Sequence, residues 1–322
     1  MKTWILRLTA IALTAATFVS HASAQSYPEK TVRLIVPWPA GGAADGVGRQ
    51  IAQALTSSLG KSVYVENIPG AGGNIGTQKF VSLPADGYAL YLATSSTNVA
   101  NPYLYKKLGF EPIKDFAPIA LVATIPSVLV VPAASPYRTP QDIVAAAKAK
   151  PAGLSYGSGG TGASAHLAGE LFKSITKIDA VHVPYKGSGP AITDVMAGQL
   201  DYMFDTGAFP YIKGGKVRAL AVAAEKRSAL LPDVPTFEEL GIEGMQMNAW
   251  YGVAAPAGTP RPIIDRLNAA LSDALKSGEL AQRLTEIGAD LRGGTPEGFS
   301  AFWKSELDRY AGLVKLTGAK LD

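Results

Sequence analysis

Cysteine is absent from all 322 residues of the chain. Its absence excludes disulfide bonds, thiolate metal sites and the attachment of a lipid to a cysteine side chain. Stability must therefore come from a sizeable apolar core. The length is typical of a chain that folds into two domains of ordinary size.

An excess of charge of either sign is also missing. The formal net charge is +4, and it falls to +2 (4 − 2) if Lys2 and Arg7 are removed with an N-terminal leader. The remaining charged residues are scattered and form no basic stripe. Nucleic acid is therefore not an expected partner.

Long hydrophobic runs are lacking as well, since about 20 apolar residues are needed to cross a bilayer. The N-terminal run Leu8–Val19 is shorter than that. It follows Lys2 and Arg7 and ends at the small residues Ala22–Ala24, a pattern typical of a secretory signal peptide over residues 1–24. We expect cleavage after Ala24 and a periplasmic protein. A retained membrane anchor is the alternative.

Complete catalytic motifs are not found. Gly60-Lys61-Ser62 would end a Walker A motif, but Leu55 stands where its first glycine is required. There is no G-x-S-x-G elbow for a nucleophilic serine. Ser164 and His166 are close in sequence but lack an evident acid to orient them. We therefore expect no catalytic residues and no enzyme.

One cofactor motif and one metal pair leave alternatives open. Gly157, Gly159 and Gly162 match G-x-G-x-x-G between a strand and a helix, so an exported NAD-binding enzyme is one alternative. The exported compartment is poor in nicotinamide cofactors, which argues against it. His166 and Glu170 are one helical turn apart, but no third metal ligand suggests itself. We expect neither a cofactor nor a metal.

What the chain does have is alternation of short strands and helices. Residues 31–36, 62–66 and 88–94 read as strands, and Asp45 reads as the N-cap of a helix over 46–59. The pattern restarts with strand, loop and helix in 154–172 and 180–198, and another strand in 200–206. This alternation predicts an α/β fold in two similar units, each with a largely parallel sheet flanked by helices.

Three further strand-like segments could pass between the two units. They are 119–132, 218–225 and 249–256. The C-terminal part reads as helical, because apolar residues such as Ile264, Leu267 and Leu271 recur on one face. These stripes predict core packing.

Glycine-rich loops stand between several of the predicted strands and helices. They read PAGGAAD, GAGGNIG, GSGGTGASAH and YKGSGPA. The first turn of a helix leaves backbone N–H groups without partners, and the helix dipole makes that end partly positive. Glycine lets a ligand approach the backbone closely, so each unit is a natural anion site. The alternative is that these loops are only turns of an α/β sheet.

Eight ordered blocks of the sequence resemble a known family. They are YPEKTVRLIVPWPAGGAAD, VENIPGAGGNIGT, DGYALYLAT, NPYLYKKLGFEPIKDFAPIALV, LSYGSGGTGASAHLAGELF, VHVPYKGSGPAITDVMAGQLDYMF, LPDVPTFEELG and WYGVAAPAGTP. The chain resembles the Bug (TctC-type) extracytoplasmic solute receptors of tripartite tricarboxylate transporters over essentially its whole mature length.

The resemblance implies a two-lobed, type II-like periplasmic binding protein with its ligand in the cleft between the lobes. The first lobe would comprise residues 25–125 and 250–322, and the second residues 126–249. The implied partners are a small carboxylate and the membrane permease subunits of the transporter, with the receptor itself a monomer. A receptor that reports to a two-component sensor instead of a transporter is the alternative.

The resemblance also implies a set of ligand-binding residues. In the first lobe they are Trp38, Ala40, Gly41, Gly42, Gly72, Gly73, Asn74, Ser95 and Thr97. In the second lobe they are Gly160, Thr161, His166, Asp205 and Phe209. In this family the first two loops characteristically hold one carboxylate through backbone groups and ordered waters. Asp205 would meet an amino or hydroxyl group or orient a water, or else serve as a cap or surface turn.

Departures from the family pattern bear on the ligand. Many members carry phenylalanine where this chain has Trp38, and Phe204 and Phe209 stand near Asp205. These aromatic residues favour an aromatic carboxylate, unless Trp38 simply packs under its loop. No arginine or lysine falls in the first loop. Neutral donors suffice, because charge-assisted hydrogen bonds contribute about 1.5–3 kcal/mol each and micromolar binding needs about −8 kcal/mol.

Overall fold

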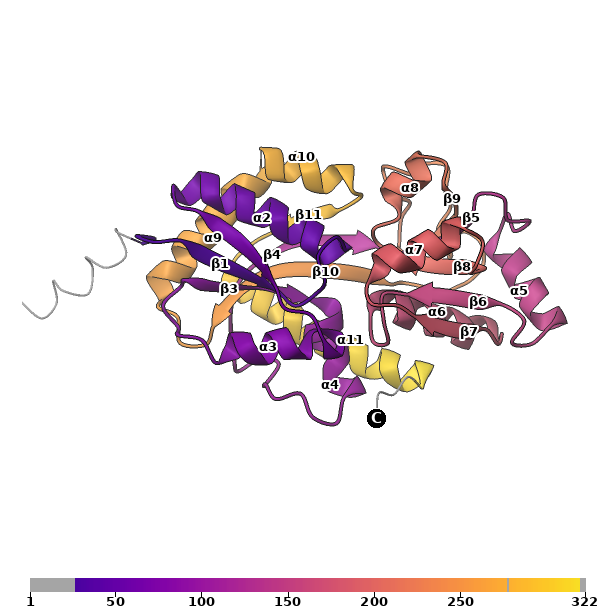
Figure 1. Cartoon of the computed structure of the whole chain (residues 1–322), viewed down its shortest axis with the longest axis horizontal. Coiled ribbons are helices and arrows are strands. Elements are labelled where there is room, and N and C mark those ends of the chain that lie inside the picture. The colour runs from indigo at the N-terminus through magenta and orange to yellow at the C-terminus, as the bar shows by residue number, and fades with distance from the viewer. Residues whose placement is uncertain (1–26, 277, 319–322) are drawn as a thin grey trace, which may run out of the picture.

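The computed structural model describes residues 27–276 and 278–318. The expected signal peptide, residues 1–24, lies outside the described residues. Two β-sheets lie end to end along the long axis of the molecule, with helices on both faces (Figure 1). We call the part built on the six-stranded sheet the first lobe and the part built on the five-stranded sheet the second lobe. The described residues contain no helix that is long and apolar enough to cross a membrane.

The first lobe carries strands in the order β11-β4-β10-β3-β1-β2. Its strands are β1 (Val32–Val36), β2 (Val63–Asn67), β3 (Ala89–Thr94), β4 (Phe116–Pro126), β10 (Asn248–Pro256) and β11 (Asp290–Gly293). Its helices are α2 (Ala43–Leu59), α3 (Asn74–Val81), α4 (Asn101–Leu104), α9 (Arg261–Lys276), α10 (Glu279–Glu286) and α11 (Pro296–Thr317). A 3₁₀ turn, η1 (Ala71–Gly73), precedes α3, and a π-helical turn, η2 (Ser96–Ala100), precedes α4.

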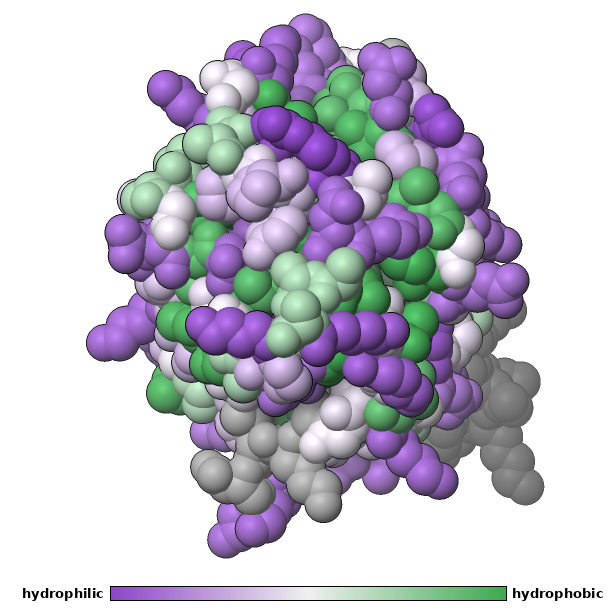
Figure 2. Space-filling view, turned by 90° about the vertical axis from the view of Figure 1, so that its right-hand side faces the viewer, coloured by the Kyte–Doolittle hydropathy of each residue, from purple (hydrophilic) through white to green (hydrophobic). Residues whose placement is uncertain are grey.

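The second lobe carries strands in the order β7-β6-β8-β5-β9. Its strands are β5 (Val128–Pro132), β6 (Ser155–Ser158), β7 (Val181–Pro184), β8 (Tyr202–Asp205) and β9 (Val217–Val222). Its helices are α5 (Pro140–Ala149), α6 (Ser164–Thr176), α7 (Ser188–Met196) and α8 (Phe209–Lys213). On its outer end, hydrophilic and hydrophobic residues are interspersed (Figure 2).

The prediction of largely parallel sheets needs correcting, because both sheets are mixed. Strands β1, β2 and β3 are parallel, as are β6, β7 and β8. Strands β4, β10 and β11 run antiparallel to their neighbours, and β5 runs antiparallel to β8 and β9. For β4 and β10 the reason is the path of the chain: β4 leaves the first lobe and β10 returns to it, so these adjacent strands run in opposite directions.

The two passages between the sheets are bonded to each other. The chain leaves the first sheet at Ser127, between β4 and β5, and comes back through residues 223–247. The Ser127 amide donates to the Met247 carbonyl, and the Ala223 amide donates to the Ser127 carbonyl, both at 2.9 Å. These hydrogen bonds join the two segments where the chain passes between the lobes.

Two apolar cores run through both lobes, one on each side of the sheets. The first core joins α2, α9 and α10 to α7 and α8. The second joins α3, α4 and α11 to α5 and α6. Figure 1 shows the same division, with α2 and α10 above the first sheet and α3, α4 and α11 below it. The sheets thus form a continuous middle layer, and the loops at their facing ends meet between the lobes.

Candidate ligand-binding site

A cavity of about 260 Å³ lies between the lobes, lined by the ends of strands from both. From the first lobe it is lined by residues 38–44, after β1, and 94–96, after β3. The second lobe contributes residues 163–165, 186–190 and 205–206, which follow β6, β7 and β8. Because the carboxyl ends of parallel strands meet at one edge of a sheet, these loops are brought together from distant parts of the chain.

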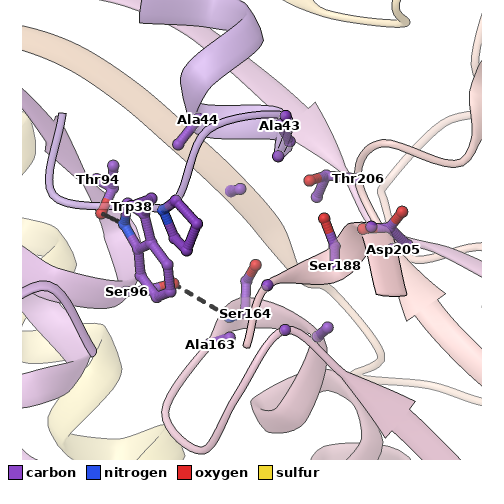
Figure 3. Close-up of a pocket in the computed structure, with 18 of the residues that line it drawn as sticks. Trp38, Ala43, Ala44, Thr94, Ser96, Ala163, Ser164, Ser188, Asp205 and Thr206 are labelled. Atoms are coloured by element: carbon purple, nitrogen blue, oxygen red, sulfur yellow. Dashed lines mark hydrogen bonds between the residues drawn. The ribbon is translucent and has the colours of Figure 1, made fainter. Parts of the chain in front are cut away.

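The lobes contact each other around this cavity. The Ser164 amide of the second lobe donates a hydrogen bond to Ser96 Oγ of the first, at 3.1 Å. A Cβ built on Gly187 would lie 3.8 Å from Pro39 Cγ, across the gap between the lobes. Figure 3 shows the Ser96–Ser164 bond as a dashed line, with Ala43 facing Thr206 and Ser188 on the other side of the cavity. The structure is therefore closed around the cavity.

Three helices begin at the cavity wall. They are α2, α6 and α7, and the residues that precede them are Gly42, Ala163 and Gly187, none of which caps its helix with a side chain. Such helix ends carry unpaired N–H groups and a partial positive charge. Residues of the first turn of each helix line the cavity. The arrangement is suited to an anion, which can accept hydrogen bonds from more than one helix end.

The start of α2 differs from the sequence prediction, since the helix begins at Ala43 and not after Asp45. Gly41 adopts a left-handed conformation with φ of 81°, which turns the chain into the helix. Asp45 Oδ2 accepts hydrogen bonds from the Gly41 amide and from Arg49 Nε, both at 2.9 Å, and Oδ1 accepts from Asn67 Nδ2. Burial alone would raise the Asp45 pKa, but these hydrogen bonds hold it below its usual value. Asp45 therefore stabilises the loop that precedes α2 and is not the N-cap of that helix.

Asp205 places a carboxyl group in the cavity lining at the end of β8. Asp205 is only 5% exposed, and its carboxyl group takes part in no ion pair within the described part of the chain. Burial raises its pKa from 3.8 to about 6, against the opposing effect of hydrogen bonds from the Gly207 and Thr206 amides. The cavity thus combines three partly positive helix ends with one buried acid.

The comparisons with known proteins agree with this geometry. A family model described as "Tripartite tricarboxylate transporter family receptor" matches residues 47–318. The chain belongs to this family. The receptor's resemblance to the Bug proteins and its two-lobed fold are thereby confirmed, and receptors of this family are periplasmic solute-binding proteins.

Three solved structures are similar to the receptor over nearly its whole length. The periplasmic binding protein BugD is 35% identical, with 91% of this chain and 99% of that chain covered and a TM-score of 0.86. Rpa4515 of R. palustris, solved with adipate, is 34% identical, with coverage of 92% and 100% and a TM-score of 0.88. MatC of Rhodopseudomonas palustris, solved with malate, is 34% identical, with coverage of 89% and 100% and a TM-score of 0.84.

The residues predicted from the sequence divide into three groups in the receptor. The first group lines the cavity between the lobes. It comprises Trp38, Ala40, Gly41, Gly42, Ser95 and Asp205. The second group lines a neighbouring hollow of about 670 Å³, and it comprises Gly72, Gly73, Gly160 and Thr161. Trp38 borders both spaces, and its indole Nε1 donates to Thr94 Oγ1 at 3.3 Å. Trp38 therefore forms part of the wall between them.

The third group lies outside the linings of both spaces. Asn74 Oδ1 accepts a hydrogen bond from Asn101 Nδ2 at 2.7 Å, and Thr97 Oγ1 donates to the Gly72 carbonyl at 3.0 Å. His166 Nδ1 accepts from the Gly162 amide at 3.2 Å. These three side chains hold the glycine loops in place from behind. Phe209 is buried against Gly288, where an added Cβ would lie 2.4 Å from the ring.

The two histidines of the described chain support the loop after β6. Their rings lie 4.2 Å apart, and His182 Nε2 is 2.7 Å from Ser158 Oγ, which in turn accepts from the Gly160 amide. Burial lowers the pKa of both, that of His182 to about 4, and the nearby His166 contributes to the shift in His182. Both imidazoles are therefore neutral near pH 7 and act as hydrogen-bonding partners.

Packing explains the G-x-G-x-x-G pattern without a dinucleotide. A Cβ on Gly159 would lie 3.0 Å from the Ser188 amide nitrogen, and one on Gly157 would lie 2.6 Å from Leu200. Gly159 thus lets the loop after β6 pack closely against the start of α7, and Gly157 lets β6 itself pack against Leu200. Glu170, the other half of the suggested metal pair, accepts hydrogen bonds from Tyr156 and Lys173.

Sequence reasoning missed several residues that line the cavity. They are Thr94, Ser96, Ser164, Lys186, Ser188, Thr206 and Tyr251. Ser164 and Ser188 each begin a helix after a glycine loop, so the pattern used for the first loop could have found them. Tyr251 comes from β10 of the first lobe, and only the meeting of the two lobes at the cavity brings it near Asp205 of the second. Burial raises the Tyr251 pKa to about 12, which keeps its hydroxyl protonated.

Proposed function

We propose that the receptor captures a small carboxylate in the cavity between its lobes and delivers it to the membrane permease of a tripartite tricarboxylate transporter. It would do so as an exported monomer, cleaved after Ala24, and without catalysing a reaction. The observation that carries the proposal is the meeting of three helix N-termini at one closed cavity. The adipate and malate bound to the two R. palustris relatives support the same ligand class.

Closure of the lobes is the mechanism that the contacts favour. A ligand in the cavity touches α2 of the first lobe and α6 and α7 of the second, so it gains its full set of contacts only when the lobes are shut. It therefore stabilises the closed state by those extra contacts. In this proposal the lobes divide near residues 125 and 250, beside the bonded passages, and the permease recognises the closed form.

The helix N-termini provide enough binding free energy for a carboxylate without an arginine. Each charge-assisted hydrogen bond contributes about 1.5–3 kcal/mol net, and a helix end adds about 0.3–1 kcal/mol. Four or five such contacts, less the cost of association, give micromolar affinity. Lys186 lies exposed at the edge of the cavity lining and adds a positive charge there.

The hypothesis of an aromatic ligand now depends on Trp38 and Tyr251, the aromatic residues of the cavity lining. Phe204 is fully buried and Phe209 packs against Gly288, so neither lines the cavity. If the ligand is aromatic, its ring would stack on the Trp38 indole. A Trp38→Ala variant should then lose more affinity for benzoate and phthalate than for adipate and malate. Equal losses for both classes would contradict the aromatic hypothesis.

A thermal-shift screen of carboxylates on the mature protein tests the proposed function. A ligand present at 100 times its Kd adds about 2.7 kcal/mol to the free energy of unfolding, which raises Tm by a few degrees. We expect acids such as malate, adipate or benzoate to raise Tm and their uncharged amides to leave it unchanged. If amides stabilise as well as acids, or if no acid of the screen does, the helix ends do not bind a carboxylate.

A further inference from the structure

Asp205 is the feature of the cavity that an anion site does not require. It is buried at the end of β8, beside Thr206 and Tyr251, in the same lining as the starts of α2 and α7. A Cβ on Gly207 would lie 3.3 Å from Asp205 Oδ2, so the backbone packs closely on one side of the carboxyl group. Asp205 nevertheless belongs to the cavity lining, where a ligand can reach it.

A carboxylate ligand and Asp205 would share one small space. Two negative charges held at short distance in a poorly solvated cavity repel each other, and each disfavours ionisation of the other. Lys186 lies in the same lining but forms no ion pair with Asp205, so it does not neutralise the acid. The conflict is relieved if the ligand itself presents a hydrogen-bond donor to Asp205.

A carboxyl group has capacity for that bond. Its two oxygens offer about four acceptor positions, and the Thr206 and Gly207 amides use part of them. A ligand hydroxyl or amino group would supply a charge-assisted hydrogen bond, which is stronger than one between neutral groups. A ligand without a donor would leave the buried acid without that partner.

We propose that Asp205 determines the substrate class, by selecting carboxylates that also carry a hydroxyl or amino group and disfavouring those that lack one. This inference depends on the proposed function, since it assumes that the helix ends hold the carboxylate. The burial that raises the pKa of Asp205 agrees with it, because a carboxylate withdrawn from water favours a hydrogen-bond donor as its neighbour.

The test compares acids that differ only by the donor. The pairs are malate and succinate, glutamate and glutarate, and 4-hydroxybenzoate and benzoate, measured by titration calorimetry on the mature protein. We expect the wild type to bind the donor-bearing acid of at least one pair about tenfold more tightly, which corresponds to about 1.4 kcal/mol. The Asp205→Asn variant should reduce that ratio to near one, partly by binding the plain acid better.

Controls separate this inference from the proposed function. Asp273→Asn removes the same charge from an exposed site on α9 and should leave every ratio unchanged. Asp205→Ser, checked for folding by circular dichroism, provides a second neutral variant and should behave like Asp205→Asn. If no acid binds the wild type, the proposed function fails. If acids bind with a ratio near one, or with a ratio that both variants preserve, Asp205 does not select the donor.

Discussion

At the scale of single residues, Asp205 is a group whose placement opposes stability. An acid with a folded-state pKa of about 6, above its ordinary 3.8, binds its proton more tightly in the folded state. Stability is therefore lost as the pH rises from about 4 to 6, and the full cost is present above that range. Such a cost is common where function needs a strained or poorly solvated group.

Replacing Asp205 with asparagine should remove the loss of stability that the buried charge causes. We expect Asp205→Asn to raise the free energy of unfolding at pH 8 by about 1–3 kcal/mol, since each pKa unit corresponds to 1.36 kcal/mol. At pH 4 the wild-type acid is largely protonated and the difference should nearly vanish. Tyr251, which faces Asp205, stays uncharged throughout this range. Urea denaturation at the two pH values measures the effect, and a gain that is the same at both would argue against it.

The position of a residue in the cavity lining can be predicted from the sequence where one short segment carries the whole signal. The whole first glycine loop lines the cavity. Asp205 also lies in the lining, because it stands at the end of a strand that the sequence pattern predicts. The sequence does not reveal which residues lie outside the lining and support a glycine loop through hydrogen bonds. Nothing in the local sequence distinguishes Thr97 and His166, which hold the glycine loops, from residues that face the space itself.

At the scale of elements, the strand–loop–helix units were predicted at nearly the observed positions. The start of α2 was not, because Asp45 resembles a cap in sequence while Gly41 and Gly42 already turn the chain. Strand direction was not predicted either, since hydrophobic patterns reveal a strand but not the direction of its neighbour. The direction follows from the path of the chain between the lobes.

The start of α7 offers a test of whether helix N-termini bind the carboxylate. Ser188 is the first residue of this helix and lines the cavity. An aspartate there would place a resident carboxylate among the N–H groups that the ligand needs. We expect Ser188→Asp to weaken the binding of every carboxylate at least tenfold while the fold is retained. Ser188→Asn has the same size without the charge and should cost much less. Similar losses in both variants, measured by calorimetry, would show that shape and not charge is responsible.

At the scale of the whole molecule, Phe209 and Gly288 form a contact between the lobes. Phe209 begins α8 of the second lobe, and Gly288 precedes β11 of the first, with no room for a side chain between them. An added methyl group at position 288 would have to push the ring, and with it α8, away from the first lobe. The lobes would then be held apart.

We therefore expect Gly288→Ala to bind its ligand more weakly and to remain larger in radius of gyration at saturating ligand. Gly294→Ala is the matched control, because Gly294 has a similar positive φ but no atom within 4 Å of the added Cβ. Both variants pay the left-handed strain, about 1–2 kcal/mol. Only the first should affect closure in small-angle scattering, and Phe209→Leu should partly restore it. Equal behaviour of the two alanine variants would show that strain alone is at work.

The division of roles inside the cavity has a consequence for how such receptors diversify. A grip made of main-chain N–H groups is encoded by the fold, and every amino acid except proline supplies the same group. Most substitutions leave these groups in place, and a substitution that adds a resident negative charge, such as Ser188→Asp, is the exception. The side chains around it, such as Asp205 and Trp38, are free to vary one at a time. Under the proposed function, a lineage of these proteins can therefore exchange one ligand for another through few mutations, while the capacity to bind a carboxylate is retained.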